Sequence, residues 1–246
     1  MFALRQVAKR FDNGTEALAE VTAEIAPGEF IVLLGPSGCG KSTLLRLLAG
    51  LESPSGGEID WGHGGKPAPG EIGYVFQDPT LLPWADAAAN VALPLRLRGV
   101  AEAQARARAE AALAQLGLGE FAGMRPRGLS GGMRMRVSIA RALVGEPELL
   151  LMDEPFAALD ELTRQKLQAD VHGLWRRSGK TVVFVTHSIY EAAFLASRIL
   201  MMSPRPGRIA QDFRPRLPEG RERRTSEAYF QLVASLQASV ERIMAP

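Results

Sequence analysis

The feature that most constrains the fold is a glycine-rich loop, GPSGCGKST, at residues 35–43. An apolar run at residues 30–34 precedes it, and a helical pattern follows from Lys41 to Ala49. The loop matches G-x-x-x-x-G-K-[ST], whose glycines let the backbone curl so that its N–H groups face a phosphate. The helix N-terminus that follows adds a partial positive charge. A strand, a phosphate-binding loop and a helix in this order predict an α/β fold.

Three more apolar runs share the character of residues 30–34: residues 72–76, 149–152 and 181–185. Short continuous apolar runs suit strands that are buried on both faces of a parallel sheet. Polar groups follow these runs: Gln77 follows the first, Asp153 and Glu154 the second, Thr186 and His187 the third. Because ligands gather at the carboxyl ends of parallel strands, we expect all four strand ends to form one site.

The rest of the chain predicts a small antiparallel hairpin at the start and helices elsewhere. Residues 2–11 and a strand ending near Ile25 flank a turn at residues 12–15. Residues 101–116 predict a helix, capped by Gly117, within a mostly helical region at about 85–145. Residues 204–224 are rich in Pro and Arg and indicate a linker. A final amphipathic helix is marked by Tyr229, Leu232, Val233, Leu236, Val240 and Ile243.

Charge, cysteine content and hydropathy narrow the class of protein. The formal net charge of +2 over 246 residues argues against nucleic acid as a partner. A single cysteine, Cys39, excludes an internal disulfide and fits a reducing compartment. The longest apolar runs fall far short of the ~20 residues that span a bilayer. We therefore expect a cytosolic chain, or one attached to a membrane only through a partner.

The residues at the strand ends are of the types that phosphoryl transfer requires. Lys41 supplies charge to the β- and γ-phosphates, and Ser42 and Asp153 suit Mg²⁺. Glu154 suits a group that polarises an attacking water. The alternative is that the DEP tripeptide at residues 153–155 simply caps the next helix.

The two remaining strand ends carry weaker signals. His187 could contact the γ-phosphate or orient water, although a lone histidine is more often structural. Gln77 could bind Mg²⁺ or water, or be a surface amide. His63 and His172 have no such context, and we expect both to be structural.

A second phosphate cradle is predicted by the sequence Leu-Ser-Gly-Gly-Met at residues 129–133. Ser130 occupies an N-cap position, so its hydroxyl and the amides of Gly131 and Gly132 would bind an anion. On its own, a Ser-Gly-Gly tripeptide is usually only a flexible turn. The chain thus has two predicted phosphate-binding cradles, of which only one contains a lysine. A single active site would not need both.

Taken together, these segments resemble those of the ATP-binding subunits of ABC transporters, to about residue 210. GPSGCGKST resembles Walker A, LSGGM the signature, and LLLMDEP at 149–155 Walker B, with Glu154 as the catalytic glutamate. Gln77 resembles the Q-loop glutamine, AALD at 157–160 the D-loop and His187 the switch histidine. Phe11 falls where the family often has an aromatic that stacks on adenine; packing on the sheet is the alternative.

The resemblance implies a P-loop ABC ATPase with a mostly parallel core sheet, an N-terminal antiparallel β subdomain and an inserted helical subdomain. The ATPase domain would be residues 1–210, with the helical subdomain at about 85–145. Residues 211–246 would be a C-terminal linker and amphipathic helix.

The resemblance also implies ATP and Mg²⁺ as cofactors and a head-to-tail homodimer, in which Walker A of one subunit and the signature of the other enclose each ATP. The implied catalytic residues are Lys41, Gln77, Glu154 and His187. The implied metal ligands are Ser42, Gln77 and Asp153. The implied nucleotide-binding residues are Phe11, Gly35, Pro36, Ser37, Gly38, Cys39, Gly40, Lys41, Ser42, Thr43, Ser130, Gly131 and Gly132.

A narrower resemblance is to the nitrate/sulfonate/taurine importer group, carried by residues 76–99, DEPFAALDELTR at 153–164 and residues 186–209. It implies ATP hydrolysis that energises import of small organic solutes through a separate permease. An extracytoplasmic solute-binding protein is implied indirectly, with the subunit peripheral on the cytoplasmic face of the inner membrane. Met133 and Met135 stand where the general signature has glutamines.

Three points stay open at the level of sequence. Trp84 is either part of a surface that docks the permease or ordinary subdomain core. A non-transport ABC ATPase, acting as a soluble mechanical module, is the alternative function, although repair-type coiled coils and a second cassette are missing. A P-loop small-molecule kinase would leave LSGGM unexplained.

Overall fold

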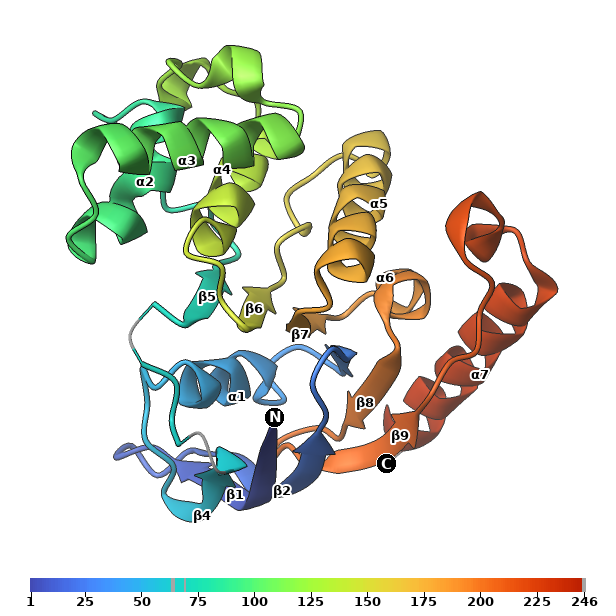
Figure 1. The fold of residues 1–246 in the computed structure, drawn as a ribbon. Coiled ribbons are helices and arrows are strands. Elements are labelled where there is room, and N and C mark those ends of the chain that lie inside the picture. The colour runs from blue at the N-terminus through green and yellow to red at the C-terminus, as the bar shows by residue number, and fades with distance from the viewer. Residues whose placement is uncertain (63–64, 69, 245–246) are drawn as a thin grey trace. The chain divides into compact units, whose positions relative to one another are not determined.

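The computed structural model describes residues 1–62, 65–68 and 70–244. The chain divides into two compact units (Figure 1). The first comprises Met1–Lys66 and Thr181–Pro246, and the second is Pro67–Lys180. Within the described residues, no helix is long and apolar enough to cross a membrane.

An antiparallel sheet opens the first unit, in the order β2-β1-β4. Its strands are β1 (Phe2–Arg10), β2 (Glu16–Ile25) and β4 (Gly56–Asp60). The predicted turn between β1 and β2 is confirmed: Gly14 has a φ of +82°, and Asn13 accepts a hydrogen bond from the Thr15 amide at 3.0 Å. β4 was not predicted, because its sequence, GGEID, has no apolar run.

The first unit also holds parallel strands, in the order β7-β3-β8, with β9 antiparallel to β8. These are β3 (Phe30–Leu34), β7 (Thr181–Thr186), β8 (Arg198–Met202) and β9 (Ile209–Phe213). Every residue of β3, β7 and β8 is buried. The helices α1 (Lys41–Leu48) and α6 (Ile189–Leu195) pack on these strands. The predicted strands at 30–34 and 181–185 are therefore confirmed.

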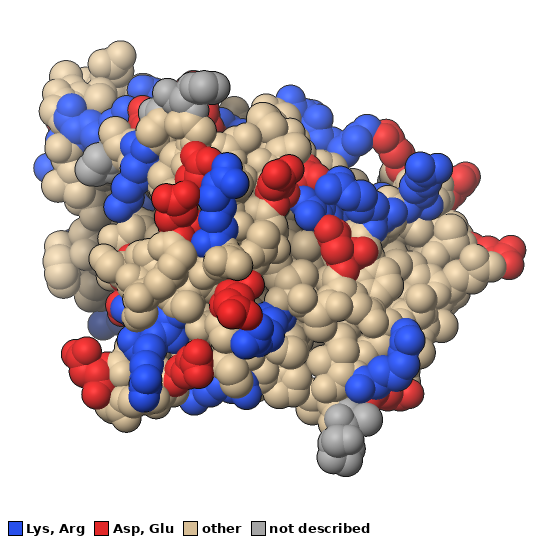
Figure 2. All heavy atoms as spheres, turned by 90° about the horizontal axis from the view of Figure 1, so that it is seen from below, with Lys and Arg blue, Asp and Glu red and all other residues tan. Residues whose placement is uncertain are grey.

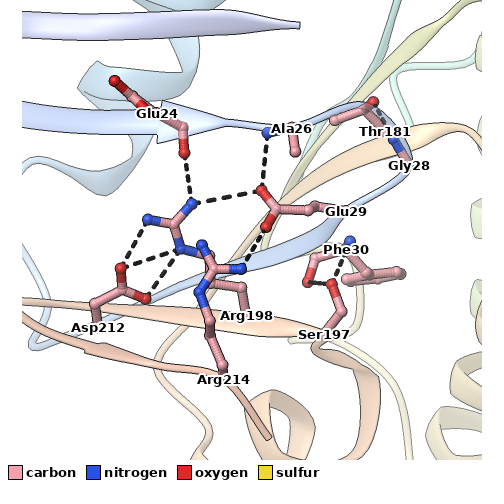
Figure 3. Close-up of polar contacts among 10 residues, drawn as sticks. All are labelled: Glu24, Ala26, Gly28, Glu29, Phe30, Thr181, Ser197, Arg198, Asp212 and Arg214. Carbon is pink, nitrogen blue, oxygen red and sulfur yellow. Dashed lines mark hydrogen bonds and ion pairs between the residues drawn. The ribbon is translucent and has the colours of Figure 1, made fainter.

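A polar network ties together the segment after β2 and the strands β8 and β9 (Figure 3). The buried Arg198 guanidinium donates to both carboxylate oxygens of Asp212, at 2.7–3.2 Å, and to the Glu24 carbonyl at 2.5 Å. The bond to Asp212 raises the pKa of Arg198 despite its burial. Glu29 contacts both Arg198 and Arg214. A buried charge of this kind requires such pairing.

The described residues of the second unit form a parallel pair of strands and four α-helices. The strands are β5 (Ile72–Val75) and β6 (Leu149–Asp153). The helices are α2 (Ala87–Leu97), α3 (Glu102–Gln115), α4 (Gly131–Leu143) and α5 (Glu161–Ser178), with 3₁₀ turns at Gly119–Phe121 and Pro126–Gly128. Helices α2, α3 and α4 pack against one another. The helix predicted at 101–116 and the strands at 72–76 and 149–152 are confirmed. So is the predicted α/β fold with a mostly parallel sheet and a separate antiparallel sheet.

The C-terminal segment of the first unit is more ordered than the sequence predicted. The prediction of a linker at residues 204–224 was wrong. This segment contains β9 and a 3₁₀ helix, Gly220–Arg224. β9 was missed because its residues alternate between half-buried and exposed, as expected of an edge strand. The amphipathic helix is confirmed as α7 (Glu227–Met244), which packs on α6.

The arginines of this segment are largely engaged by the protein itself. Arg208 pairs with Glu20, and Arg214 pairs with Glu29. On the face shown in Figure 2, basic and acidic side chains are interspersed. Two of the arginines are therefore paired with carboxylates within the first unit.

Candidate active site

The phosphate loop, residues 35–43, lies between β3 and α1 of the first unit. Gly38 and Gly40 have φ angles of +77° and +103°, a region that side chains rarely adopt. A Cβ on Gly40 would lie 2.6 Å from the carbonyl oxygen of Ala17. Glycine at position 40 is thus required both by the backbone angle and by the close approach of β2.

The side chain of Lys41 lies within the curl of this loop. It is 4% exposed, and its Nζ donates to the carbonyl oxygens of Gly35 and Pro36, each at 2.8 Å. The N-cap of α1 is Gly40, which has no side chain to accept the first N–H groups of the helix. A buried ammonium and a helix N-terminus without a side-chain cap suit an anion such as a phosphate.

A segment from the other end of the chain supports the loop from outside. Arg205 Nε donates to the Gly38 carbonyl at 3.0 Å, and the Gly207 amide donates to the Ala17 carbonyl at 3.0 Å. A Cβ on Gly207 would lie 2.0 Å from the Cys39 carbonyl oxygen. The roles of Arg205 and Gly207 were not predicted from the sequence; their signal is the motif PRPG at residues 204–207, after β8.

His187 follows β7, next to the phosphate loop. The register pairs Leu34 with Thr186, so Gly35 and His187 leave neighbouring parallel strands at the same edge. His187 is exposed. The structure therefore brings together two of the four predicted strand ends in the first unit.

The other two strand ends meet in the second unit. Val75 pairs with Met152, so Gln77 and Glu154 follow neighbouring strands. Gln77 is exposed, and Asp153 is 9% exposed with Tyr74 Oη donating to its Oδ2 at 3.5 Å.

Glu154 has a φ of +43°, which is strained for a residue with a side chain. Such strain is common at functional sites, where it re-aims a side chain. The next helix, α5, is capped by Asp160, whose carboxylate accepts from the Thr163 amide at 3.0 Å. Neither Asp153 nor Glu154 caps α5, so the capping alternative is wrong.

The predicted second cradle is the N-terminus of α4, in the second unit. Ser130 is its N-cap, and the hydroxyl accepts from the Met133 amide at 3.3 Å. A Cβ on Gly132 would lie 2.4 Å from Thr163 Cγ2, so this glycine lets α4 approach α5. At Gly131 the nearest atoms to a Cβ would be 4.0 Å away. Packing within the chain therefore does not demand glycine at 131.

Met135 of α4, where the family resemblance leads us to expect a glutamine, is 3% exposed and belongs to the buried core.

Trp84 is 70% exposed, so of the two alternatives left open by the sequence, the one that places it in the subdomain core is wrong. The buried Asn90 fixes the segment before α2. Its side chain accepts from the Leu82 amide at 2.7 Å and donates to the carbonyls of Leu82, Ala85 and Asp86. A cavity of about 410 Å³ is lined by Pro83, the residue before Trp84, and by Met124, Arg125, Arg127 and Gly128.

The remaining predicted residues are placed as follows. Phe11 is half-buried at the hairpin, with Lys9 Nζ 5.2 Å from its ring centroid. His172 packs against Trp175, with ring centroids 5.4 Å apart, in keeping with a structural role. His63 lies outside the described residues.

The oxygen donors available for a divalent cation are few but chemically suitable. Among the described residues, no group of three or more His, Cys, Asp or Glu side chains could hold a metal. Ser42, Gln77 and Asp153 offer hydroxyl, amide and carboxylate oxygens, which Mg²⁺ prefers. Mg²⁺ typically takes one or two carboxylates and completes its shell with substrate phosphates and water. Each of the three groups is a suitable ligand for such an ion, with Ser42 in the first unit and Gln77 and Asp153 in the second.

Comparison with known proteins places these features in one family. The profile of the ABC transporter family matches residues 18–157. The chain is 47% identical over 245 residues to the aliphatic sulfonates import ATP-binding protein of Cupriavidus necator, covering 97% of this chain and 77% of that protein. It is 46% identical over 242 residues to the taurine import ATP-binding protein of Rhizobium johnstonii, covering 96% and 92%.

Solved structures agree with the fold. A dimeric ATP-binding cassette in a post-hydrolysis state, bound to ADP and Pi, superposes with a TM-score of 0.75 at 35% identity. The match covers 88% of this chain and 99% of that one. A cassette of Clostridium perfringens, part of an ABC transporter complex, gives a TM-score of 0.79 at 27% identity, covering 98% and 96%. The chain therefore belongs to the ABC transporter family, as an ATP-binding subunit with ATPase activity.

Proposed function

We propose that two copies of this chain hydrolyse ATP at shared sites and thereby drive solute import through a separate membrane permease. The observation that carries this is the pair of phosphate cradles in one chain. One cradle holds the buried Lys41; the other, at Ser130 and Gly131, has a helix N-terminus with no lysine in its loop. A second cradle is surplus unless it serves the nucleotide of another copy.

In this proposal, the γ-phosphate of ATP lies between the phosphate loop of one copy and Ser130 of the other. The loop amides and the α1 N-terminus bind the β-phosphate, and Lys41 neutralises charge on the β- and γ-phosphates. The Ser130 hydroxyl and the Gly131 amide bind the γ-phosphate from the opposite side. Phe11 would stack on adenine.

Ser42, Gln77 and Asp153 would hold Mg²⁺, whose role when bound is to neutralise the developing charge on the phosphates. Glu154, whose backbone φ is +43°, polarises the attacking water. His187 orients the water and the γ-phosphate. Loss of the γ-phosphate removes the group that bridges the two copies, so they separate.

The names of the relatives support a proposal for the cargo and the partners. They are named for import of aliphatic sulfonates and of taurine. We infer a similar class of small organic solute, delivered by an extracytoplasmic binding protein to a permease. The subunit would lie on the cytoplasmic face of the inner membrane, with the exposed Trp84 and the cavity lined by the preceding Pro83 as the surface for the permease. Residues 1–210 form the ATPase domain, with its helical subdomain at about 85–145, and residues 211–246 form a C-terminal segment.

The test is to mix two inactive variants, Lys41→Ala and Ser130→Ala. If Ser130 acts on the partner's nucleotide, a mixed dimer has one site with both defects and one intact site. We expect the mixture to hydrolyse ATP well above either variant alone, measured as phosphate release at equal total protein. A mixture no more active than its components would show that Ser130 serves its own chain, and would overturn the shared site.

A further inference from the structure

The C-terminal segment carries one buried cation that the proposed function does not use. Arg223, in the 3₁₀ helix Gly220–Arg224, is 7% exposed. Its Nε donates to the carbonyl of Phe194 at 2.5 Å, and its Nη2 donates to the carbonyl of Ala196 at 3.1 Å. Both carbonyls belong to the C-terminal end of α6. A planar guanidinium can serve two carbonyls at once, which the point charge of a lysine cannot do with the same geometry.

Two more side chains from the same segment hold α6. The Arg224 guanidinium lies 3.8 Å from the centroid of the Phe194 ring, at the C-terminal end of the helix. Tyr229 of α7, 5% exposed, donates from its hydroxyl to the carbonyl of Tyr190 at 3.3 Å, in the first turn. We call these three residues, Arg223, Arg224 and Tyr229, the α6 clamp. The clamp contacts both ends of a helix that has only seven residues.

The start of α6 is tied directly to His187. Ser188 caps the helix, its hydroxyl accepting from the Glu191 amide at 3.4 Å. The buried Glu191 accepts from the Thr186 hydroxyl at 2.5 Å, and that same hydroxyl accepts from the Ser188 amide at 3.0 Å. The residues on either side of His187 are therefore bonded into the first turn of α6.

We infer that Arg223 is a positioning residue for ATP hydrolysis, acting through α6 on His187. A helix of seven residues is too short to be stable on its own, so its place depends on what packs against it. The clamp fixes the position of α6. The hydrogen bonds in the first turn of α6 then fix the position of His187 relative to the helix. This inference rests on the proposed role of His187 in hydrolysis.

The first test separates turnover from ATP binding. For Arg223→Ala we expect kcat to fall by about 10- to 100-fold, as for a misplaced catalytic group. The KM for ATP should change little, because the phosphate loop is on a different element. Arg223→Lys should recover part of kcat, and Arg216→Ala, which removes an exposed arginine of the same segment, should match the wild type. A variant Arg223→Ala with wild-type kcat would overturn the inference.

The second test asks whether Arg223 acts through His187. In the double variant Arg223→Ala/His187→Ala, kcat should be no lower than in His187→Ala alone, because residues of one unit are non-additive. Losses that multiply would show that Arg223 acts elsewhere and would overturn the inference. Wild-type turnover in His187→Ala would instead remove His187 from the proposed mechanism.

The third test does not use activity, so it tests the clamp whatever the role of His187. Hydrogen exchange at residues 189–195 should become faster in Arg223→Ala and unchanged in Arg216→Ala. Tyr229→Phe removes one hydroxyl and keeps the ring, so it tests the clamp even if Arg223→Ala does not fold. It should speed exchange in the first turn of α6. Unchanged exchange in folded Arg223→Ala, or in Tyr229→Phe if the alanine variant is unfolded, would overturn the clamp.

Discussion

Glu154 shows how one backbone angle can matter at the scale of a residue. It follows a fully buried strand and has a φ of +43°, which costs free energy in a residue with a Cβ. Such an angle persists only when the surroundings impose it. The neighbouring Asp153 is buried, so two adjacent carboxylates lie in different environments and can take different roles.

Glu154→Gln keeps the size of the side chain and removes its ability to polarise water. We expect kcat for ATP hydrolysis to fall by about 100-fold or more, since general-base catalysis contributes ~10²- to 10⁴-fold. ATP binding should persist and dimers should accumulate, measured by nucleotide retention and size-exclusion chromatography with ATP. Normal turnover would remove Glu154 from this role.

Ser138 of α4 tests the cost of a buried hydroxyl. Its Oγ is buried and has no hydrogen-bond partner among the residues that the structure describes. Ser138→Ala should therefore raise the free energy of unfolding by about 1 kcal/mol, measured by urea denaturation. Ser239→Ala is the matched control, because the buried Ser239 Oγ accepts from Arg242 at 3.1 Å and its loss should destabilise. Destabilisation of both variants alike would contradict this account.

At the scale of elements, helix caps and short polar contacts decide where segments begin. Asp160 begins α5, Ser130 begins α4 and Ser188 begins α6, each through a side-chain oxygen that accepts from a backbone amide. All three caps are local, so sequence patterns can reveal them. Arg141 of α4 acts over a longer distance: it donates to the carbonyls of Pro79 and Thr80, beyond Gln77, and burial lowers its pKa.

Asp160 makes the stability of α5 depend on pH. Hydrogen bonds from the Thr163 amide lower the pKa of Asp160 below its ordinary value of 3.8. A lowered pKa gives stability that is present above the unfolded value and lost as pH falls through the folded value. The advantage of wild type over Asp160→Ala in Tm should thus shrink between about pH 5 and pH 3. Asp160→Asn keeps a cap without titrating, so its advantage over Asp160→Ala should not shrink.

Asn90 controls the segment that carries Trp84. Its buried amide makes four hydrogen bonds to backbone groups of residues 82–86. Asn90→Ala should lower the free energy of unfolding by about 2 kcal/mol, because buried groups lose their partners. Hydrogen exchange at residues 82–86 should become faster. Trp84→Ala, which removes only an exposed side chain, should leave both measurements unchanged; a similar loss in both variants would argue against a specific role for Asn90.

At the scale of the whole molecule, two exposed surfaces have no role in a single chain but have one in the proposed assembly. The α4 cradle and the exposed Trp84 both lie in the second unit, and both present groups outward. Large exposed aromatic side chains are enriched at protein interfaces. In the proposed transporter, the first faces another copy of the chain and the second faces the permease.

The variant Trp84→Ala distinguishes the proposed roles of these two surfaces, ATP hydrolysis and coupling to the permease. The basal ATPase of the purified subunit should stay nearly intact, while uptake that depends on the permease should fall severalfold, measured with vesicles that contain the complete transporter. Leu51→Ala, which removes another exposed apolar side chain, in the first unit, is the control and should retain uptake. Equal losses of ATPase and uptake would show that Trp84 supports the fold and not the coupling.

The sequence alone determined the parts of this protein that are contiguous in the chain. The phosphate loop, the buried strands 30–34 and 181–185 and the helix capped by Ser130 depend on neighbours within a few residues, so sequence patterns reveal them. Only the tertiary structure decided the rest. β9 pairs with β8 in a register that no local sequence pattern specifies. Trp84 is exposed, whereas the sequence left a docking surface and a buried core position equally open. Arg205 and Arg223 lay in a segment that predicted a linker, because their partners, Gly38, Phe194 and Ala196, are distant in sequence. A hydrogen bond to a distant carbonyl leaves no trace in local composition, and it is through such bonds that the C-terminal segment supports both the phosphate loop and α6.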